Sequence, residues 1–165
     1  ILQLRKTLEC IAFAAIAPNR KAYEQFRNSD FTKDFNAKKI TSQLNLINKH
    51  FYPKPILPAV RDENNVWNHA RKKSGFLTQK RFEKVYDRLG KYLHSDNPWG
   101  NDKGLSNFAN EFPSIVKQIE SLLALHITSI ITPDFKGVWI VESDSNFARA
   151  RIITAQADGE FEFTS

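Results

Sequence analysis

The chain lacks methionine altogether and contains one cysteine among its 165 residues. Because a translated protein begins with methionine, the opening Ile1 predicts that this sequence is part of a longer protein. The lone Cys10 excludes a framework of internal disulfides and favours a reducing compartment. No apolar run approaches the roughly 20 residues that span a bilayer, and no signal segment opens the chain. We therefore expect a cytoplasmic protein with no membrane partner.

Motifs for bound metals and nucleotides are missing as well. The four histidines and Cys10 show no paired metal-ligand spacing, which argues against a zinc site. The stretch 100–104 (GNDKG) lacks the pattern of a phosphate-binding P-loop, and there is no Gly-x-Ser-x-Gly elbow. The sequence therefore predicts neither a metal nor an organic cofactor.

Basic residues outnumber acidic ones, 24 against 18, which gives a formal net charge of +6 at pH 7. Such an excess suits a polyanion such as RNA, because each neutralised phosphate releases counterions. It is equally typical of a solvated basic surface, and both interpretations stay open. The basic residues gather in short clusters, which are Arg20 and Lys21, Lys38 and Lys39, Arg71 with Lys72 and Lys73, and Lys80 with Arg81.

Most of the chain up to residue 131 has the apolar period of amphipathic helices. The pattern predicts helices over 1–16, in a short segment after Pro18, over 32–49, over 79–94, and from Pro113 to about residue 130. Residues 52–76 combine three prolines with mixed charge, so we expect a long irregular loop there with room for a short hairpin.

The pattern changes after Pro133. Residues 138–141, 148–153 and 161–163 are predicted as short strands separated by turn-prone residues. The sequence thus predicts a mainly α fold, a helical bundle of four to five helices with a small C-terminal antiparallel β-meander. We expect two regions, the bundle over 1–131, including loop 52–76, and the meander over 132–165 packed on it.

The helix predicted over 79–94 has the clearest signals. Thr78 is a good N-cap, and Leu77 with Phe82 has the spacing of a hydrophobic staple. The helix contains Arg88 and ends at His94, just before a loop rich in Gly, Asn and Pro.

Arg88 and His94 are residue types that can cleave RNA without a metal. Imidazole serves as general base or general acid near pH 7, and a guanidinium holds phosphoryl oxygens with fork geometry. On an ideal helix the two side chains lie about 120° apart. They converge only if the helix frays near its end or if two subunits pool their residues.

An arginine followed after four to six residues by a histidine, late in a helical bundle, resembles the signature of the HEPN superfamily. The resemblance covers about residues 1–131 and places the pair at Arg88 and His94. It implies a homodimer with the motif paired across the two-fold, and a cognate protein partner. Many HEPN proteins are metal-independent endoribonucleases of prokaryotic defence and toxin–antitoxin systems. For this chain the resemblance implies that His94 moves protons and that Arg88 stabilises the phosphorane charge.

Neighbouring residues could assist these two. Lys91 adds phosphate affinity, Tyr92 could stack a base, and Glu9 or Asp87 could orient Arg88. The basic triplet Arg71, Lys72 and Lys73 is a further candidate for phosphate binding.

A structural interpretation of the pair remains open. Arg88 can pair with a carboxylate such as Glu9, while His94 caps the C-terminus of its helix. The chain would then be a non-catalytic interaction or sensor domain of a larger defence or regulatory protein.

Overall fold

The computed structural model describes residues 1–27, 30–93, 104–132, 135–144 and 149–156. Within these ranges the α-helices are α1 (Leu2–Ile16), α2 (Arg20–Arg27), α3 (Ala37–Ile47), α4 (Gln79–Leu93) and α5 (Leu105–Leu123), with short 3-10 turns η1 (Ala17–Asn19) and η2 (Phe31–Lys33). The strands are β1 (Lys54–Pro55), β2 (Val60–Arg61), β3 (Trp67–Asn68), β4 (Leu125–Thr132), β5 (Phe135–Asp144) and β6 (Arg149–Gln156). No helix of the described ranges is long and apolar enough to cross a membrane.

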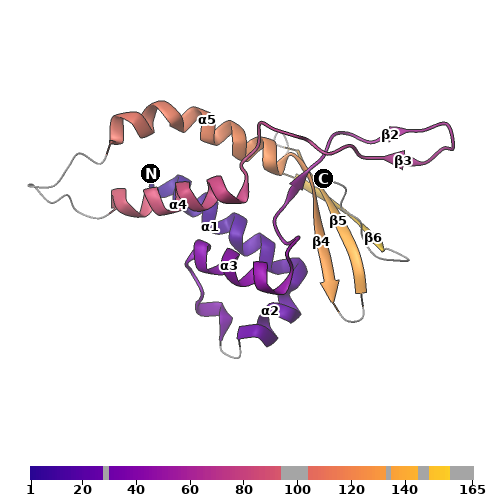
Figure 1. The fold of residues 1–165 in the computed structure, drawn as a ribbon, viewed down its shortest axis with the longest axis horizontal. Coiled ribbons are helices and arrows are strands. Elements are labelled where there is room, and N and C mark those ends of the chain that lie inside the picture. Colours follow the sequence, from indigo (N-terminus) through magenta and orange to yellow (C-terminus); the bar gives the residue numbers. More distant parts are fainter. Residues whose placement is uncertain (28–29, 94–103, 133–134, 145–148, 157–165) are drawn as a thin grey trace, which may run out of the picture.

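The strands form two separate antiparallel sheets. Four of them join in the order β1-β4-β5-β6, and the register aligns Ile127 with Ile140 and Ile140 with Ile153. Strands β2 and β3 pair with each other and form an arm that projects from the body of the protein (Figure 1). The helices lie to one end of the larger sheet, with α5 and α4 side by side and α1, α3 and α2 below them (Figure 1).

The predicted fold class is wrong, because the structure is a mixed α/β fold and not a helical bundle with a small meander. The decisive segment is 125–132, which we predict as the end of the last helix and which forms β4 instead. This segment is rich in β-branched residues, among them Ile127, Thr128 and Ile130, which pack well on a pleated sheet. The predicted division at residue 131 consequently falls inside β4.

The other predicted strands correspond to longer elements than the sequence suggests. Strand β5 spans Phe135–Asp144 around the predicted 138–141, and β6 spans Arg149–Gln156 around the predicted 148–153. The strand predicted at 161–163 lies outside the described residues. Residues 52–76 hold β1 and the β2–β3 arm, and Pro55 lies at the edge of the sheet, where a missing backbone donor is tolerated.

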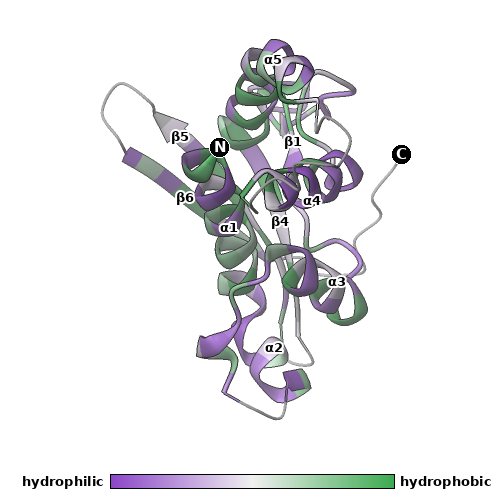
Figure 2. Ribbon diagram, turned by 90° about the vertical axis from the view of Figure 1, so that its left-hand side faces the viewer, coloured by the Kyte–Doolittle hydropathy of each residue, from purple (hydrophilic) through white to green (hydrophobic). Residues whose placement is uncertain are grey.

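One apolar core joins the helices. Leu8 of α1, Leu44 of α3, Leu89 of α4 and Leu122 of α5 are all buried in it. Apolar residues are concentrated on α1 and α5, whereas α2 is mainly hydrophilic (Figure 2). The helical part of the fold therefore depends on the same apolar stripes that the sequence displays.

A buried polar network links the helices to the sheet. Asn48, just after α3, donates to Asn19 Oδ1 at 3.0 Å and to the Ser129 carbonyl oxygen of β4 at 3.1 Å. Ser129 Oγ donates in turn to the His50 carbonyl oxygen at 2.9 Å. Because these groups are withdrawn from water, their hydrogen bonds fix one relative placement of helix and strand.

Candidate functional site

Helix α4 begins as the sequence predicts. The Arg81 backbone N–H donates to Thr78 Oγ1 at 3.3 Å, so Thr78 caps the helix. Phe82, Val85, Tyr86 and Leu89 face the core. This arrangement leaves the opposite side of the helix, including Arg88, toward α5 and solvent.

Three contacts hold the Arg88 side chain. Its Nη1 donates to Glu111 Oε1 of α5 at 3.0 Å, its Nε to the Tyr92 hydroxyl at 2.7 Å, and its Nη2 to the Gly104 carbonyl oxygen at 3.4 Å. The guanidinium carbon also lies 5.1 Å from the centre of the Phe108 ring. The side chain is 32% exposed, so it is held in place yet open to water.

Glu111 bridges two arginines. It accepts from Arg81 at 2.9 Å and from Arg88 at 3.0 Å, and we call Arg81, Arg88, Tyr92 and Glu111 the α4–α5 cluster. The hydrogen bonds from Arg88 and then Arg81 lower the pKa of Glu111, and the bond to Glu111 raises the pKa of Arg88. Two guanidinium groups against one carboxylate leave the cluster with a net positive charge.

The two carboxylates predicted to orient Arg88 have other partners. Glu9 pairs with Arg5 at 3.2 Å and accepts from the Tyr86 hydroxyl at 3.1 Å. Asp87 pairs with Lys38 of α3. The carboxylate that holds Arg88 is Glu111, which is 23 residues further along the chain.

His94 lies outside the described residues, directly after Leu93, the last residue of α4. Its distance from Arg88 is therefore not part of the structure, and its role stays a prediction. Tyr92, predicted to stack a base, bonds Arg88 and packs on Phe108 with ring centres 5.2 Å apart.

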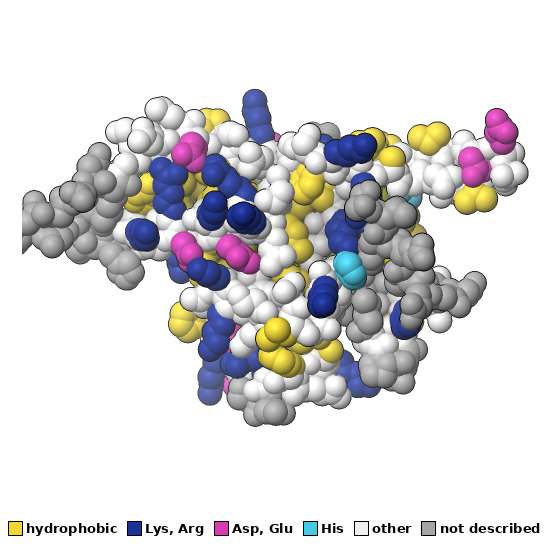
Figure 3. Space-filling model, in the orientation of Figure 1, with side chains coloured by type: hydrophobic (Ala, Val, Ile, Leu, Met, Phe, Trp, Pro, Cys, Tyr) yellow, Lys and Arg dark blue, Asp and Glu magenta, His cyan; other side chains and the backbone are white. Residues whose placement is uncertain are grey.

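Exposed lysines continue the positive surface along α4. Lys80, Lys84 and Lys91 are exposed and recur at spacings of four and seven residues, which places them on one side of the helix. Figure 3 shows Lys and Arg side chains gathered over α4 and α5, with a few carboxylates between them. We call Lys80, Lys84 and Lys91 the α4 lysine stripe.

The three basic residues predicted to bind phosphate, Arg71, Lys72 and Lys73, have different neighbours in the structure. Lys72 Nζ donates to Ser121 Oγ of α5 at 2.6 Å, and Lys73 is exposed. Arg71 forms a β-bridge with Ile56, which brings it beside β1. There it lowers the pKa of both Lys54 and His50 by charge repulsion.

His50 and Lys54 form a cluster with Arg71 that no sequence motif predicts. His50 Nδ1 lies 2.8 Å from Lys54 Nζ. Burial first, and Arg71 second, lower the pKa of Lys54 to about 8. Burial is also the main cause that lowers the pKa of His50, followed by Lys54 and Arg71. His50 and Lys54 are four residues apart, whereas Arg71 reaches them through the Ile56–Arg71 bridge, so the sequence carries no local signal for the arginine.

No group of three or more metal-ligating side chains occurs within the ranges that the structure describes. Comparison of the chain with protein families, with curated proteins and with solved structures gives no match.

Proposed function

We propose that this chain binds RNA along the exposed side of α4 and cleaves it without a metal ion, as the resemblance to the HEPN superfamily implies. In this proposal Arg88 neutralises charge on the phosphoryl oxygens, and His94 exchanges protons with the ribose hydroxyl and the leaving oxygen. A homodimer, a cognate protein partner and a role in prokaryotic defence or a toxin–antitoxin system belong to the same proposal.

The observation that carries it is the fixed placement of Arg88. Glu111, Tyr92 and Gly104 engage three of the five N–H donors of its guanidinium, on a helix whose last residue directly precedes His94. A guanidinium that is already oriented loses little freedom when it binds a phosphate, which is the requirement for electrostatic catalysis.

The charge around Arg88 supports the binding step. The α4–α5 cluster has a net positive charge, and Lys91 lies within one turn of Arg88 on the same helix. The rest of the α4 lysine stripe extends this surface along about three turns of helix, enough for several consecutive phosphates. The support comes from α4 and the residues that hold Arg88 on it, since the helical-bundle part of the resemblance does not hold.

A separate observation supports a second function. The Arg88–Glu111 ion pair and the Tyr92–Phe108 contact join α4 to α5, which gives Arg88 and Tyr92 a purely structural use. On this alternative the chain is a non-catalytic interaction or sensor domain of a larger defence or regulatory protein. Replacing Arg88 would then weaken folding or partner binding and leave RNA intact.

An RNA cleavage assay in EDTA separates the two functions. A labelled single-stranded RNA is incubated with the wild-type chain, with His94→Ala, and with Arg88→Ala. We expect cleavage by the wild type and a loss of at least about 100-fold in His94→Ala, because a general acid–base group contributes roughly that factor. Arg20→Ala, which removes an exposed arginine of α2, serves as the control and should cleave normally.

Folding and assembly are measured on the same samples. Circular dichroism and sedimentation check that each variant is folded and show whether the wild type is a dimer. Equal cleavage by wild type and His94→Ala, or no cleavage by a folded wild-type dimer, would refute the catalytic proposal. RNA binding without cleavage would support the second function, a non-catalytic interaction or sensor domain.

A further inference from the structure

A cavity of about 510 Å³ lies between the β2–β3 arm and one face of the four-stranded sheet, and none of its lining residues belongs to the α4–α5 cluster. The strand register determines which side chains form the floor of the cavity. Leu125, Glu142 and Arg151 form one cross-strand row, and Ile140 with Ile153 forms the next row on the same face. The floor is therefore apolar at one end and charged at the other.

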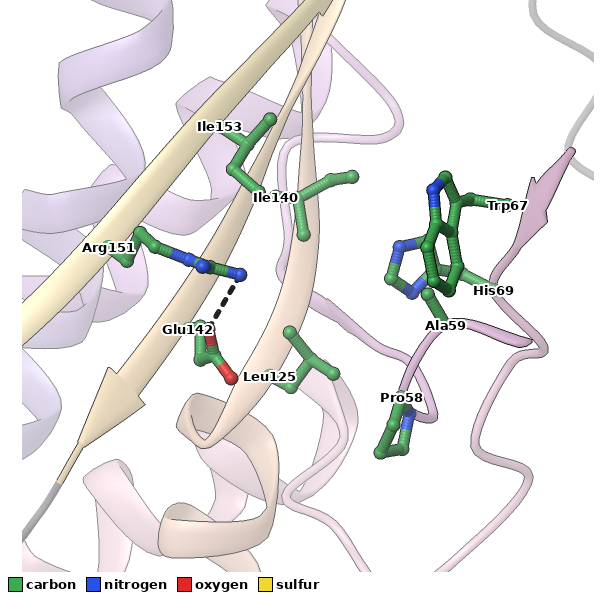
Figure 4. A pocket seen from close by; sticks show the side chains of 9 residues that line it. All are labelled: Pro58, Ala59, Trp67, His69, Leu125, Ile140, Glu142, Arg151 and Ile153. Atoms are coloured by element: carbon green, nitrogen blue, oxygen red, sulfur yellow. Dashed lines mark ion pairs between the residues drawn. The ribbon is translucent and has the colours of Figure 1, made fainter. Parts of the chain in front are cut away.

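The opposite wall is aromatic. Trp67 and His69 of the arm lie beside each other and face Ile140 and Leu125 across the cavity (Figure 4). His69 Nδ1 lies 3.1 Å from the Leu57 carbonyl oxygen, so this nitrogen carries the hydrogen and the ring orientation is fixed. Trp67 is 63% exposed although it lines a cavity, and exposing so large an apolar residue is unfavourable.

The charged end holds an arginine that is only partly engaged. Arg151 Nη2 contacts Glu142 Oε2 at 3.1 Å, which is the ion pair drawn in Figure 4. The Arg151 side chain is 71% exposed, and a guanidinium has five N–H donors, so a second pair of oxygens can bind it beside Glu142. Planar carboxylates match this fork geometry.

From these contacts we propose that the cavity is a binding site for a small planar aromatic molecule that carries a carboxylate. The ring lies between Trp67 and the aliphatic floor of Ile140 and Ile153, and the carboxylate accepts from Arg151. The size of the cavity and its mainly apolar wall with a few polar groups are those of sites for small ligands. The proposal is independent of RNA cleavage, because the cavity shares no residue with α4.

The test uses 2-naphthoate as the probe and neutral 2-naphthamide as its matched analogue, with binding measured by calorimetry. We expect the wild type to bind the carboxylate roughly tenfold more tightly than the amide, because only the carboxylate makes a charge-assisted contact. Arg151→Gln should remove this preference, and Trp67→Ala should weaken both probes. Arg149→Gln, an exposed arginine of β6 outside the cavity, is the control and should behave as wild type.

A second measurement locates the probe without any variant. In an amide and indole NMR spectrum of the wild type, 2-naphthoate should shift the Trp67 indole signal and the signals of Ile140 and Ile153 more than those of α4. Absence of binding to the wild type, unchanged affinity in both Trp67→Ala and Arg151→Gln, or shifts confined to other residues would each overturn the proposal.

Discussion

At the scale of single residues, burial separates the contacts that stabilise this protein from those that are free to act on a ligand. The Arg88–Glu111 pair is short, at 3.0 Å, but both side chains are about one-third exposed. An ion pair in such surroundings adds little to stability, because water screens it. Asn48, by contrast, is only 3% exposed and serves two acceptors from different elements. We therefore expect Asn48, and not Arg88, to control stability.

Replacing Asn48 by alanine tests this ranking. The substitution leaves Asn19 Oδ1 and the Ser129 carbonyl oxygen without the donor that Asn48 supplies, inside the protein. We expect the free energy of unfolding to fall by about 1–3 kcal/mol, the cost of unsatisfied buried polar groups. Urea unfolding of Asn48→Ala measures it, with the exposed Asn45→Ala of α3 as the control, which should stay within about 0.5 kcal/mol of wild type. Equal losses in both variants would contradict the role of the network.

The position of Arg88 on its helix was the part of the candidate site that the sequence predicted best. Arg88 does lie on the exposed side of a capped helix, since the stripe of Phe82 and Leu89 determines which side is buried. The identity of its carboxylate partner was not predictable. Glu9 and Glu111 look alike in the sequence, and only the packing of α5 against α4 brings Glu111 to Arg88.

At the scale of elements, the boundary between α5 and β4 shows where periodicity fails. The apolar residues of α5, such as Ile115, Ile119 and Leu122, recur at helical spacing, and Ile127 and Ile130 continue it formally. The chain nevertheless changes to a strand at Leu125, because β4 has β1 and β5 as pairing partners. So short an apolar run fits both the spacing of a helix and the alternation of a strand. Pairing with neighbouring strands therefore determines which of the two forms.

The β5–β6 pair offers a test at the same scale. A Cβ on Gly137 of β5 would lie 2.7 Å from the backbone oxygen of Ala155 in β6, closer than real contacts allow. Gly137→Ala should therefore force the strands apart and lower the free energy of unfolding by about 1–3 kcal/mol, the usual cost of overpacking. Hydrogen exchange should quicken in β6 first.

The control for this change is Ala150→Val, which adds carbon atoms at an exposed position of β6. A strand favours valine, so its stability should stay within about 0.5 kcal/mol of wild type. A Gly137→Ala variant as stable as the control would show that the two strands have room to adjust.

At the scale of the whole molecule, charge is the property most directly connected to the proposed function. The chain carries a formal net charge of +6, and its exposed lysines include the α4 lysine stripe. A surface of this kind binds RNA through counterion release, so the affinity must fall as salt rises. A stable interaction through apolar contacts would show little dependence on salt.

The salt dependence can be assigned to α4 with a triple variant. Each phosphate neutralised on single-stranded RNA contributes about 0.7 to the slope of log affinity against log salt concentration, so replacing three contacting lysines should reduce the slope by about 2. Fluorescence anisotropy with a labelled RNA measures the slope. The variant replaces Lys80, Lys84 and Lys91 by glutamine, and the control, with the same net charge, replaces Lys6, Lys21 and Lys33. Equal slopes in the α4 variant and the control variant would contradict RNA binding along α4. They would mean that the RNA binds elsewhere or that the slope depends only on the net charge of the protein.

The sequence by itself determined where α4 begins and which of its sides is buried. Local signals, such as Thr78 as an N-cap and the apolar stripe of α4, act between residues a few positions apart, so they are legible without the fold. The tertiary structure alone decided that the fold is mixed α/β, that Glu111 holds Arg88, and that Trp67 faces Ile140 across a cavity. The contact of Arg88 with Glu111 and the approach of Trp67 to Ile140 join residues more than 20 positions apart, so they depend on the packing of the entire chain. The change from α5 to β4 depends on strand partners, because the apolar pattern of this segment fits a helix as well as a strand.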